Sequence, residues 1–385
     1  SGNVYIGNFG QRPFSHTPPS GYKTVNSKNL PLNVPSIIRP QKHFESLIYT
    51  GDGTAIRSIS GLEFKPDLVW IKNRSQTDWH IWSDVVRGFD GKTLYSNRTD
   101  AEYDASGSGE HGYISAVHDH GFVVKDDDGS VGGNCNANSE NYVAWCWKAG
   151  GAAVTNNDGS VASQVSANTE AGFSICTWTG TGSNLTFGHG LGKKPDWVIT
   201  KARTGSSGCD WFVYHKDIGA THNLRLNTQD ASSTASDLFN NTEPTSSVFS
   251  IGNSSCINEN GGTYISYCWT AIPGFSAFGK YTGNGNADGP YVHLGFRPAW
   301  LLLRGTHADI WYLYDNKRNT FNVVDKEINP NRDQSEASFT TADFLSNGFK
   351  IRTSNSSFNY SGYTYLYMAF AEQPGTTPFA TFPNA

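Results

Sequence analysis

The fold is decided by a stretch that occurs three times in the chain: Pro66-Asp67-Leu68-Val69-Trp70-Ile71, Pro195-Asp196-Trp197-Val198-Ile199 and Pro298-Ala299-Trp300-Leu301-Leu302. Each proline comes 17 residues after the aromatic residue of a turn with the pattern aromatic-Thr-Gly-x-Gly. These turns begin at Tyr49, Trp178 and Tyr281. Proline suits the first position of a strand, because that position need not donate a ladder hydrogen bond. The chain therefore contains three copies of one β unit.

Two further landmarks follow in the same order in every copy. The first is a pair of aromatic residues three positions apart: Trp79 and Trp82, Trp211 and Tyr214, Trp311 and Tyr314. We interpret Trp79, Trp211 and Trp311 as equivalent residues, each filling the core of its own copy. The second is a closing strand: Tyr142-Val143-Ala144-Trp145-Cys146-Trp147, Tyr264-Ile265-Ser266-Tyr267-Cys268-Trp269 and Tyr365-Leu366-Tyr367-Met368-Ala369-Phe370. A position shared by Cys146, Cys268 and Ala369 indicates a small, buried side chain.

These repeats define the expected architecture. A copy of about 100 to 125 residues holds about six to eight strands, which is the size of a β-sandwich domain. We therefore predict an all-β chain of three tandem antiparallel β-sandwich (jelly-roll-like) domains. The predicted sandwiches occupy residues 46–150, 172–272 and 273–376, and the remaining segments are an N-terminal stretch (1–45), a linker hairpin (151–171) marked by Asp158-Gly159, and a C-terminal tail (377–385).

Charge and composition exclude several classes of function. The 29 basic and 34 acidic residues give a net charge of −5 without a cationic block, so we expect no nucleic-acid partner. No apolar stretch approaches the roughly 20 residues of a membrane span, so we expect no membrane insertion. The six cysteines lack the paired spacings of a zinc site, and the sequence favours buried free thiols over disulfides. These cysteines are Cys135, Cys146, Cys176, Cys209, Cys256 and Cys268.

Candidate catalytic groups are weak, and we predict that the chain is not an enzyme. The acidic run Asp126-Asp127-Asp128 precedes Gly129 and is typical of a solvated turn, and His118 and His120 adjoin Gly121 without a third metal ligand. The sequence contains no nucleophile elbow, no P-loop and no dinucleotide fingerprint. No acid, histidine or serine is shared by all three copies within the landmarks. We predict no catalytic residues, no metal and no cofactor.

Aromatic residues are the remaining candidates for ligand contact. All 11 tryptophans fall within the landmark segments, where another copy usually has a comparable apolar group, so we assign them to the core. Tyr103, Tyr113 and Tyr360 lie in unmatched segments, where packing does not explain an aromatic ring. Because a tyrosine combines an apolar body with a polar tip, we take these three as ligand-binding candidates.

Two parts of the chain resemble bacteriophage proteins. The stretch Asn8-Phe9-Gly10-Gln11-Arg12-Pro13-Phe14, followed by Pro18-Pro19-Ser20-Gly21-Tyr22 and Asn29-Leu30-Pro31, looks like the last strand and exit loop of the SPRY-type, concanavalin-like domains of phage tail proteins. The other residues resemble a repeat module of marine and cyanobacterial phage virion proteins. The motifs that carry this likeness are Pro66-Asp67-Leu68-Val69-Trp70-Ile71-Lys72-Asn73-Arg74, Tyr142-Val143-Ala144-Trp145-Cys146-Trp147-Lys148-Ala149-Gly150-Gly151 and Tyr314-Asp315-Asn316-Lys317-Arg318.

The resemblance implies a function and a setting. Such modules occur in tail fibres and related adhesion proteins, so the chain is expected to bind a host-surface glycan or receptor as part of a tail or fibre. Its expected partners are other virion proteins and two further copies in a homotrimer, its place is the virion after assembly in the host cytoplasm, and it is expected to begin inside a larger polypeptide. Two alternatives stay open: a passive structural spacer of the virion and a polysaccharide depolymerase. Variable loops on a rigid scaffold suit binding, but independently folded sandwiches suit a spacer nearly as well.

Overall fold

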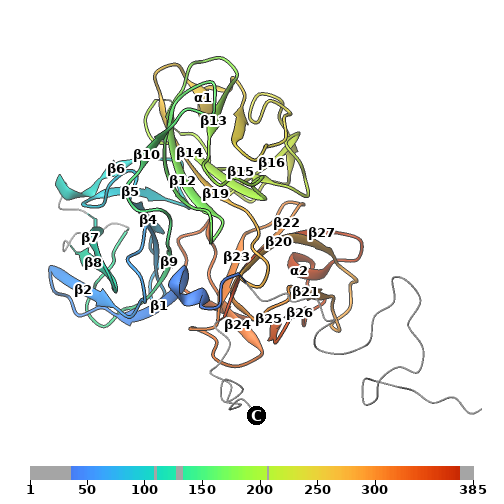
Figure 1. Cartoon of the computed structure of the whole chain (residues 1–385). Coiled ribbons are helices and arrows are strands. Elements are labelled where there is room, and N and C mark those ends of the chain that lie inside the picture. Colours follow the sequence, from blue (N-terminus) through green and yellow to red (C-terminus); the bar gives the residue numbers. More distant parts are fainter. Residues whose placement is uncertain (1–35, 108–110, 127–132, 206–207, 373–385) are drawn as a thin grey trace, which may run out of the picture.

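The strands of the chain form antiparallel sheets grouped into three repeats (Figure 1). The computed structural model describes residues 36–107, 111–126, 133–205 and 208–372. Most of the predicted N-terminal segment (1–45) and the whole predicted C-terminal tail (377–385) lie outside these residues. Within the described ranges, no helix has the length and apolar character that a membrane crossing requires. The predicted all-β, antiparallel sandwich fold is confirmed.

Repeat one comprises η1 (Pro40–Lys42), β1 (Phe44–Thr50), β2 (Ile56–Ser60), β3 (Leu68–Asn73), β4 (Ile81–Asp84), β5 (Lys92–Tyr95), β6 (Tyr103–Asp104), η2 (Ala105–Gly107), β7 (Tyr113–His118), β8 (Gly121–Lys125) and β9 (Asn141–Trp147). Repeat two comprises β10 (Val154–Asn156), β11 (Ser163–Asn168), β12 (Phe173–Thr179), β13 (Leu185–Gly188), β14 (Trp197–Ala202), β15 (Phe212–His215), β16 (His222–Arg225), β17 (Ser233–Thr234), β18 (Val248–Ile251), α1 (Ser255–Asn258) and β19 (Thr263–Trp269). Repeat three comprises β20 (Ser276–Thr282), β21 (Tyr291–His293), β22 (Pro298–Gly305), β23 (Tyr312–Asp315), β24 (Val324–Glu327), β25 (Ala337–Leu345), β26 (Gly348–Ile351), α2 (Ser356–Asn359) and β27 (Thr364–Ala371).

Each repeat has an inner sheet with the same central strand order. The orders are β1-β9-β3-β4 in repeat one, β12-β19-β14-β15 in repeat two and β20-β27-β22-β23 in repeat three. Smaller outer sheets cover them: β2-β8-β7, β13-β18 and β21-β26-β25-β24. In repeat two, the segment marked by Asp158-Gly159 forms the hairpin β10–β11, which extends the inner sheet through β12.

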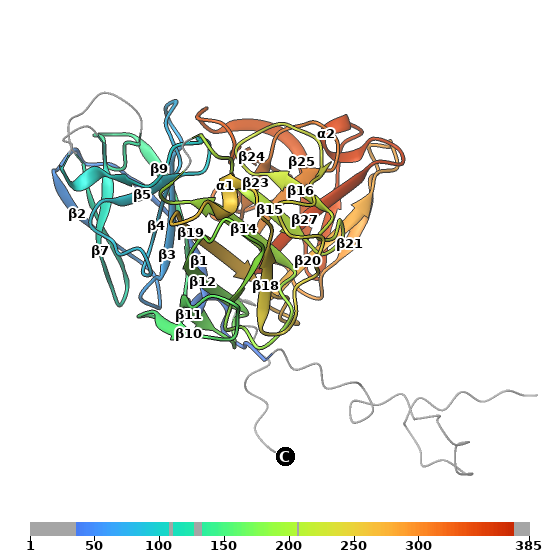
Figure 2. The ribbon, with the colours of Figure 1, turned by 90° about the horizontal axis from the view of Figure 1, so that it is seen from above.

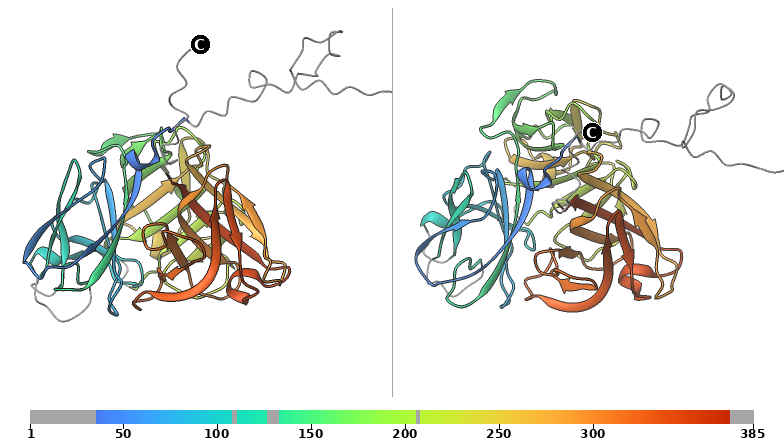
Figure 3. Two further views of the ribbon diagram at one scale, coloured as in Figure 1. Left: turned by 90° about the horizontal axis from the view of Figure 1, so that it is seen from below. Right: turned by 60° about the horizontal axis from the view of Figure 1, so that its bottom comes forward.

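Both faces of every inner sheet are buried, and they face different cores. In β3, Leu68 and Trp70 point into a central cluster, whereas Val69 and Ile71 point into the sandwich core of repeat one. The central cluster also takes in residues of repeats two and three, so the three inner sheets pack on one another around a common centre (Figures 2 and 3). Its largest members are Trp70, Trp82, Trp145, Trp147, Trp197, Trp211, Trp269, Trp300 and Trp311. The described residues thus form three separate sandwich cores and one core that all three repeats share.

The strand register corrects one predicted equivalence. Leu68 pairs with Asp84, Trp197 with His215 and Trp300 with Asp315, which makes His80, and not Trp79, the counterpart of Trp211 and Trp311. Trp79 belongs to the edge of the sandwich core of repeat one. The prediction that Trp211 and Trp311 fill the cores of their own sandwiches was also wrong, because both lie in the shared central cluster. Equal spacing of aromatic residues concealed a shift of one residue along the strand.

The aromatic-Thr-Gly-x-Gly turns owe their sequence to close backbone contacts. A Cβ atom on the first glycine (Gly51, Gly180 or Gly283) would lie 2.0 to 2.3 Å from a carbonyl oxygen. The second glycine (Gly53, Gly182 or Gly285) has a φ of 69° to 73°, in the left-handed region that other residues rarely adopt. The leading aromatic ring stacks on the first tyrosine of the closing strand, with centroids 5.0 to 5.7 Å apart.

A buried asparagine fastens each of these turns. Asn136, Asn258 and Asn359 are fully buried, and the side-chain oxygen of each accepts a hydrogen bond from the residue between the two glycines of the turn. Each asparagine lies six residues before the first tyrosine of the closing strand. That tyrosine accepts a hydrogen bond on its hydroxyl from the backbone N–H that follows the asparagine. The turn and the closing strand are therefore locked together in every repeat.

Neighbouring repeats are joined by hydrogen bonds that run in one direction around the centre. The Nε1 of Trp211 donates to the carbonyl of Tyr95 (3.1 Å), and the Nε1 of Trp311 donates to that of Arg225 (2.9 Å). The His80 Nε2 lies 3.1 Å from the carbonyl oxygen of Asn329 and closes the ring. Because Trp70 donates to the His80 Nδ1, the proton of this imidazole lies on Nε2.

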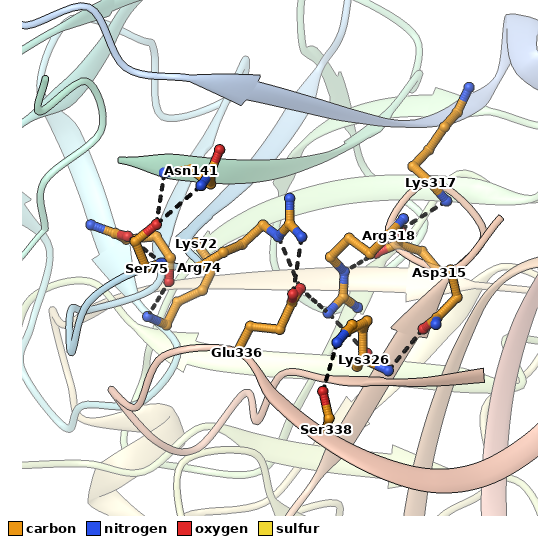
Figure 4. Close-up of polar contacts among 12 residues, drawn as sticks. Lys72, Arg74, Ser75, Asn141, Asp315, Lys317, Arg318, Lys326, Glu336 and Ser338 are labelled. Carbon is orange, nitrogen blue, oxygen red and sulfur yellow. Dashed lines mark hydrogen bonds and ion pairs between the residues drawn. The ribbon is translucent and has the colours of Figure 1, made fainter. Parts of the chain in front are cut away.

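Two of the three boundaries also carry a network of charges. Between repeats one and three, Glu336 binds Arg74 through two hydrogen bonds of 2.9 Å and contacts Arg318, which pairs with Asp315 (Figure 4). Between repeats one and two, Glu102 likewise binds Arg203 and contacts Arg87, which pairs with Asp84.

The third boundary, between repeats two and three, has neutral residues at the corresponding positions. Ser232 takes the place of the glutamate, and Thr306 takes the place of the arginine that binds it from the neighbouring repeat. Ile218 and His215 take the places of the buried arginine and its aspartate partner. A cleft of about 440 Å³ opens there, lined by Asp217, Ile218, His222, Ser232, Lys280, Thr306 and Thr364. The three boundaries are therefore equivalent in backbone but unequal in side-chain contacts.

The cysteines follow the sequence expectation only in part. Cys146, Cys176 and Cys268 are buried free thiols, Cys135 is buried as well, and the predicted burial of the small position at Cys146, Cys268 and Ala369 is confirmed. Cys209 and Cys256, in contrast, form a disulfide, so the preference for free thiols was wrong for this pair. The two residues are 47 positions apart and come together only through the fold.

Candidate functional site

Repeat three carries a cleft of about 210 Å³ with an aromatic lining, which we call the aromatic cleft. Three rings line it: Tyr312 of β23, Phe339 of β25 and Phe358 of α2. Phe339 is 37% exposed, whereas Tyr312 and Phe358 are largely covered. The polar lining residues are Glu327, Ser338, Asn355 and Ser357. An exposed ring next to several hydrogen-bonding groups is the combination that suits a wet, partly apolar ligand.

The rings of the aromatic cleft support one another. The ring of Phe358 lies 4.4 Å from that of Tyr312 and stacks on that of Phe339 at 5.8 Å with an interplanar angle of 19°. Asn355 fixes the start of α2, since its Oδ1 accepts a hydrogen bond of 2.8 Å from the N–H of Ser357. The cleft is thus held in shape by its own residues.

A second group of rings continues from the cleft. The hydroxyl of Tyr312 donates to Asp309, whose other oxygen lies 3.6 Å from the Nε2 of His307. The ring of His307 lies 4.8 Å from that of Tyr363, which in turn lies 4.5 Å from that of Tyr360. Tyr360 and Tyr363 are 51% and 43% exposed. We call Phe339, Phe358, Tyr312, His307, Tyr363 and Tyr360 together the aromatic strip.

Comparison of the repeats shows that the outer part of the strip is not required by the fold. Counted from the asparagine that fastens the turn, the position of Tyr360 is Ala137 in repeat one and Glu259 in repeat two. By the same count, the residue at the position of Tyr363 is Glu140 in repeat one and Gly262 in repeat two. Since the same backbone forms without these rings, stability of the fold does not explain their presence in repeat three.

The cleft opens where the other repeats tie two loops together. In repeat one, Asp78 accepts a hydrogen bond of 2.9 Å from the N–H of Asn134. In repeat two, the disulfide Cys209–Cys256 occupies the same two positions, which lie two residues before Trp211 and Asn258. In repeat three these positions are Asp309 and Ser357. In repeat three, Asp309 instead accepts hydrogen bonds from its own segment, from the N–H of Ile310 and the hydroxyl of Tyr312. Ser357 lines the cleft.

Glu327 is the one charged side chain among the residues that line the aromatic cleft. It is half-buried, and burial raises the pKa of its carboxyl group; the hydroxyl of Tyr314 and the more distant Arg332 act in the opposite direction. The Tyr314 hydroxyl lies 3.3 Å from its Oε2. Within the described part of the chain, no lysine, arginine or histidine forms an ion pair with Glu327.

The three tyrosines predicted from the sequence lie in different settings. Tyr360 is exposed and belongs to the aromatic strip. Tyr113 is 4% exposed on β7, so its ring is covered by the protein. Tyr103 is half-buried at the edge of the repeat-one core and packs against His111 at 5.1 Å. Tyr103 belongs to β6 and Tyr113 to β7 of repeat one, and Figure 1 shows these strands apart from α2 of repeat three, which Tyr360 follows.

Sequence reasoning missed most of the aromatic cleft. Tyr312, Phe339, Phe358 and Glu327 come from four separate segments that only the folded chain brings together. Tyr363 could have been found, because the fixed spacing from the asparagine to the closing tyrosine shows that the other repeats have no ring at this position.

Among the described residues, the other candidate groups do not assemble into a site. The Nε2 of His118 lies 3.0 Å from the Ser58 hydroxyl, and the Nδ1 of His120 lies 3.3 Å from the carbonyl of Leu62. Asp127 and Asp128 lie outside the described residues. Among the residues that the structure describes, no group of three or more histidine, cysteine, aspartate or glutamate side chains could hold a metal ion.

Comparison with known proteins identifies the family of the chain. Residues 39–374 match the model of a family described as a domain of unknown function, DUF7483. No curated protein matches the chain. The family match begins before β1 and ends after β27, so a single family unit contains all three repeats. This agrees with the shared central cluster, which makes the three repeats parts of one packed body.

Proposed function

Since the chain belongs to the DUF7483 family of domains of unknown function, we propose from its own residues that it is a glycan-binding adhesion module, with the aromatic strip of repeat three as its contact surface. The observation that carries this proposal is the presence of exposed rings at positions where the other repeats have none. Sugars offer apolar C–H faces and hydroxyl groups together. The strip offers aromatic rings, and the cleft that three of these rings line also has hydrogen-bonding side chains.

The setting in a bacteriophage tail or fibre is part of the same proposal. It is supported by the resemblance of the Pro66–Arg74 and Tyr142–Gly151 stretches to phage virion modules. The rigid three-repeat body suits this role, because a site on a stiff scaffold keeps its geometry while neighbouring loops vary. The proposed partners are other virion proteins and a host-surface glycan, and the proposed assembly is a homotrimer, which light scattering of the full chain at micromolar concentration would test.

Glycan-array binding of the full chain, followed by variants of the strip, tests the proposal. Phe339→Ala, Tyr360→Ala and Tyr363→Ala should each weaken binding by about tenfold or more, as expected for loss of a stacking ring. Their melting temperatures should stay within about 2 °C of the parent, since exposed residues contribute little to stability. Tyr291→Ala is the matched control, because Tyr291 is a 44% exposed ring of the same repeat outside the strip.

The outcomes separate the alternative functions. Failure of the parent chain to bind any glycan or host surface would overturn the proposal and favour a passive spacer. Release of reducing ends from a bound polysaccharide would instead identify a depolymerase. Equal loss of binding in Tyr291→Ala and the strip variants would remove the assignment of the strip.

A further inference from the structure

We infer that the aromatic cleft selects a sugar with a free, protonated amino group, and that Glu327 is the residue that recognises this group. The inference rests on the proposed glycan-binding function and specifies the chemical class of the ligand. It starts from the lining of the cleft, which combines three aromatic rings with a single carboxylate. Both kinds of group attract a cation: the ring faces through their negative quadrupole and the carboxylate through a charge-assisted hydrogen bond.

The position of Glu327 shows that the carboxylate is not a requirement of the strand. Leu94, Leu224 and Ile328 are equivalent, because they pair with Trp82, Val213 and Leu313 at the same register. The residues before them are Thr93, Asn223 and Glu327. Thr93 and Asn223 are buried and neutral, whereas Glu327 is half-buried and borders a cleft. Only repeat three has placed a charge here.

The surroundings leave this charge open to a ligand cation. Glu327 has no ion pair among the described residues, and the neutral Tyr314 hydroxyl lies 3.3 Å from its Oε2. Asp309, which accepts a hydrogen bond from the Tyr312 hydroxyl, adds a second negative charge and acts to raise the pKa of Glu327. Leaving a half-buried carboxylate without a cation is unfavourable, so a bound ammonium group would gain from pairing with it.

The basic groups near the cleft are already engaged or distant. The Nζ of Lys326 donates a hydrogen bond of 2.7 Å to the Ser338 hydroxyl at an exposed position, as Figure 4 shows. The guanidinium of Arg332 contacts the side-chain oxygens of Gln334 and Gln229 at 3.3 Å. Neither side chain lines the cleft. The cleft therefore offers an ammonium group the exposed ring of Phe339 and the carboxylate of Glu327, and none of its lining residues offers a cation to a sugar carboxylate or sulfate.

Matched pairs of monosaccharides test the inference on the full chain. Glucosamine and glucose, and galactosamine and galactose, would be titrated at pH 6.5 with chemical-shift or calorimetric detection. We expect the amino sugar of each pair to bind at least about fivefold more tightly. Glu327→Gln should reduce this preference to less than about twofold, because the amino sugar loses the carboxylate that recognises its ammonium group. Phe339→Ala should weaken binding of both members of a pair.

A control variant shows that the effect belongs to this carboxylate. Glu45 is also a half-buried glutamate whose pKa is raised by burial, but it lines a different cleft and pairs with Lys317 at 3.0 Å. Glu45→Gln should leave the preference for amino sugars intact. Equal binding of amino and neutral sugars through Phe339 would overturn the inference and leave the proposed function standing. Absence of binding to every saccharide would overturn the proposed function, and the inference with it.

Discussion

The hydroxyl of Tyr267 in repeat two donates a hydrogen bond of 2.8 Å to the carboxylate of Asp84 in repeat one. At the equivalent place between repeats one and three, the Nε1 of Trp145 donates to Asp315 at 3.0 Å. At the third boundary the carboxylate is replaced by His215, and the residue equivalent to the donor is Met368. Donor and acceptor are thus lost together, because a buried donor without its partner would cost about 1 to 3 kcal/mol.

We predict that the boundary between repeats two and three is the least protected of the three. Each boundary contains one equivalent backbone hydrogen bond, donated by the N–H of Glu102, Ser232 or Glu336 across to the neighbouring repeat at 3.0, 2.8 and 3.0 Å. The Ser232 amide should exchange with solvent faster than the other two, since neutral residues stand here in place of the charged network and a cleft lies beside it. Native-state hydrogen exchange followed by NMR measures all three amides in one experiment. Equal protection would show that the networks do not stiffen the boundaries.

Trp311→Ala should destabilise the whole chain and not repeat three alone. Trp311 is fully buried in the cluster that all three repeats share and is hydrogen-bonded to repeat two, so its truncation leaves a cavity in that shared cluster. We expect a loss of about 3 to 5 kcal/mol and a single calorimetric transition at lower temperature. Ile48→Ala, at a 48% exposed position of β1, is the control and should change stability by less than about 0.5 kcal/mol. An early, separate transition in Trp311→Ala would instead mean that the repeats unfold independently, as expected for three separate tandem domains.

The sequence predicts three repeats, but it does not predict that they share a core and should therefore unfold together. The Pro66 to Ile71 stretch and its two copies predict strands, repeats and the all-β class, because period and turn chemistry are local. The apolar residues Leu68 and Val69 predict a strand with two buried faces, but the sequence near the strand does not predict that one of these faces packs against the other repeats. The same limit applies to the candidate site. Tyr360 stands out by comparison of the repeats, whereas Phe339 and Glu327 become neighbours only through the packing of β24, β25 and α2.

Cys209→Ser should cost repeat two about 2 to 4 kcal/mol of stability, because the disulfide closes a loop of 47 residues and restricts the unfolded chain. The matched change is Asp78→Ser, which removes the hydrogen bonds that tie the same two loops in repeat one. Urea unfolding with and without reductant measures both effects. Reductant should lower the stability of the parent and of Asp78→Ser, and it should leave Cys209→Ser unchanged. An unchanged parent under reducing conditions would contradict a stabilising role of the bond.

Stability should fall as the pH drops below about 6.5, because three fully buried histidines resist protonation. Burial lowers the pKa of His189 to about 4 and that of His215 to about 3, and it lowers the pKa of His80 well below its usual value. In each case the unfolded chain binds a proton that the folded chain does not, between the folded pKa and about 6.5. The free energy of unfolding therefore rises with pH in this window, by at most about 1.4 kcal/mol per pH unit for each histidine.

His215→Asn isolates one of these three contributions. The asparagine oxygen can accept the hydrogen bond of 3.1 Å that the Nδ1 of His215 receives from the N–H of Asp217, but it does not titrate. Burial is the main cause of the lowered pKa of His215, and the positive charges of Lys216 and Lys280 lower this pKa further. His215→Asn leaves both lysines in place. Between pH 6 and pH 4.5, the slope of stability against pH should be smaller in His215→Asn than in the parent by about 1.4 kcal/mol per unit. Urea unfolding at several pH values measures the slope, and parallel curves for the two proteins would show that His215 is already protonated in the folded state or is not buried as a neutral ring.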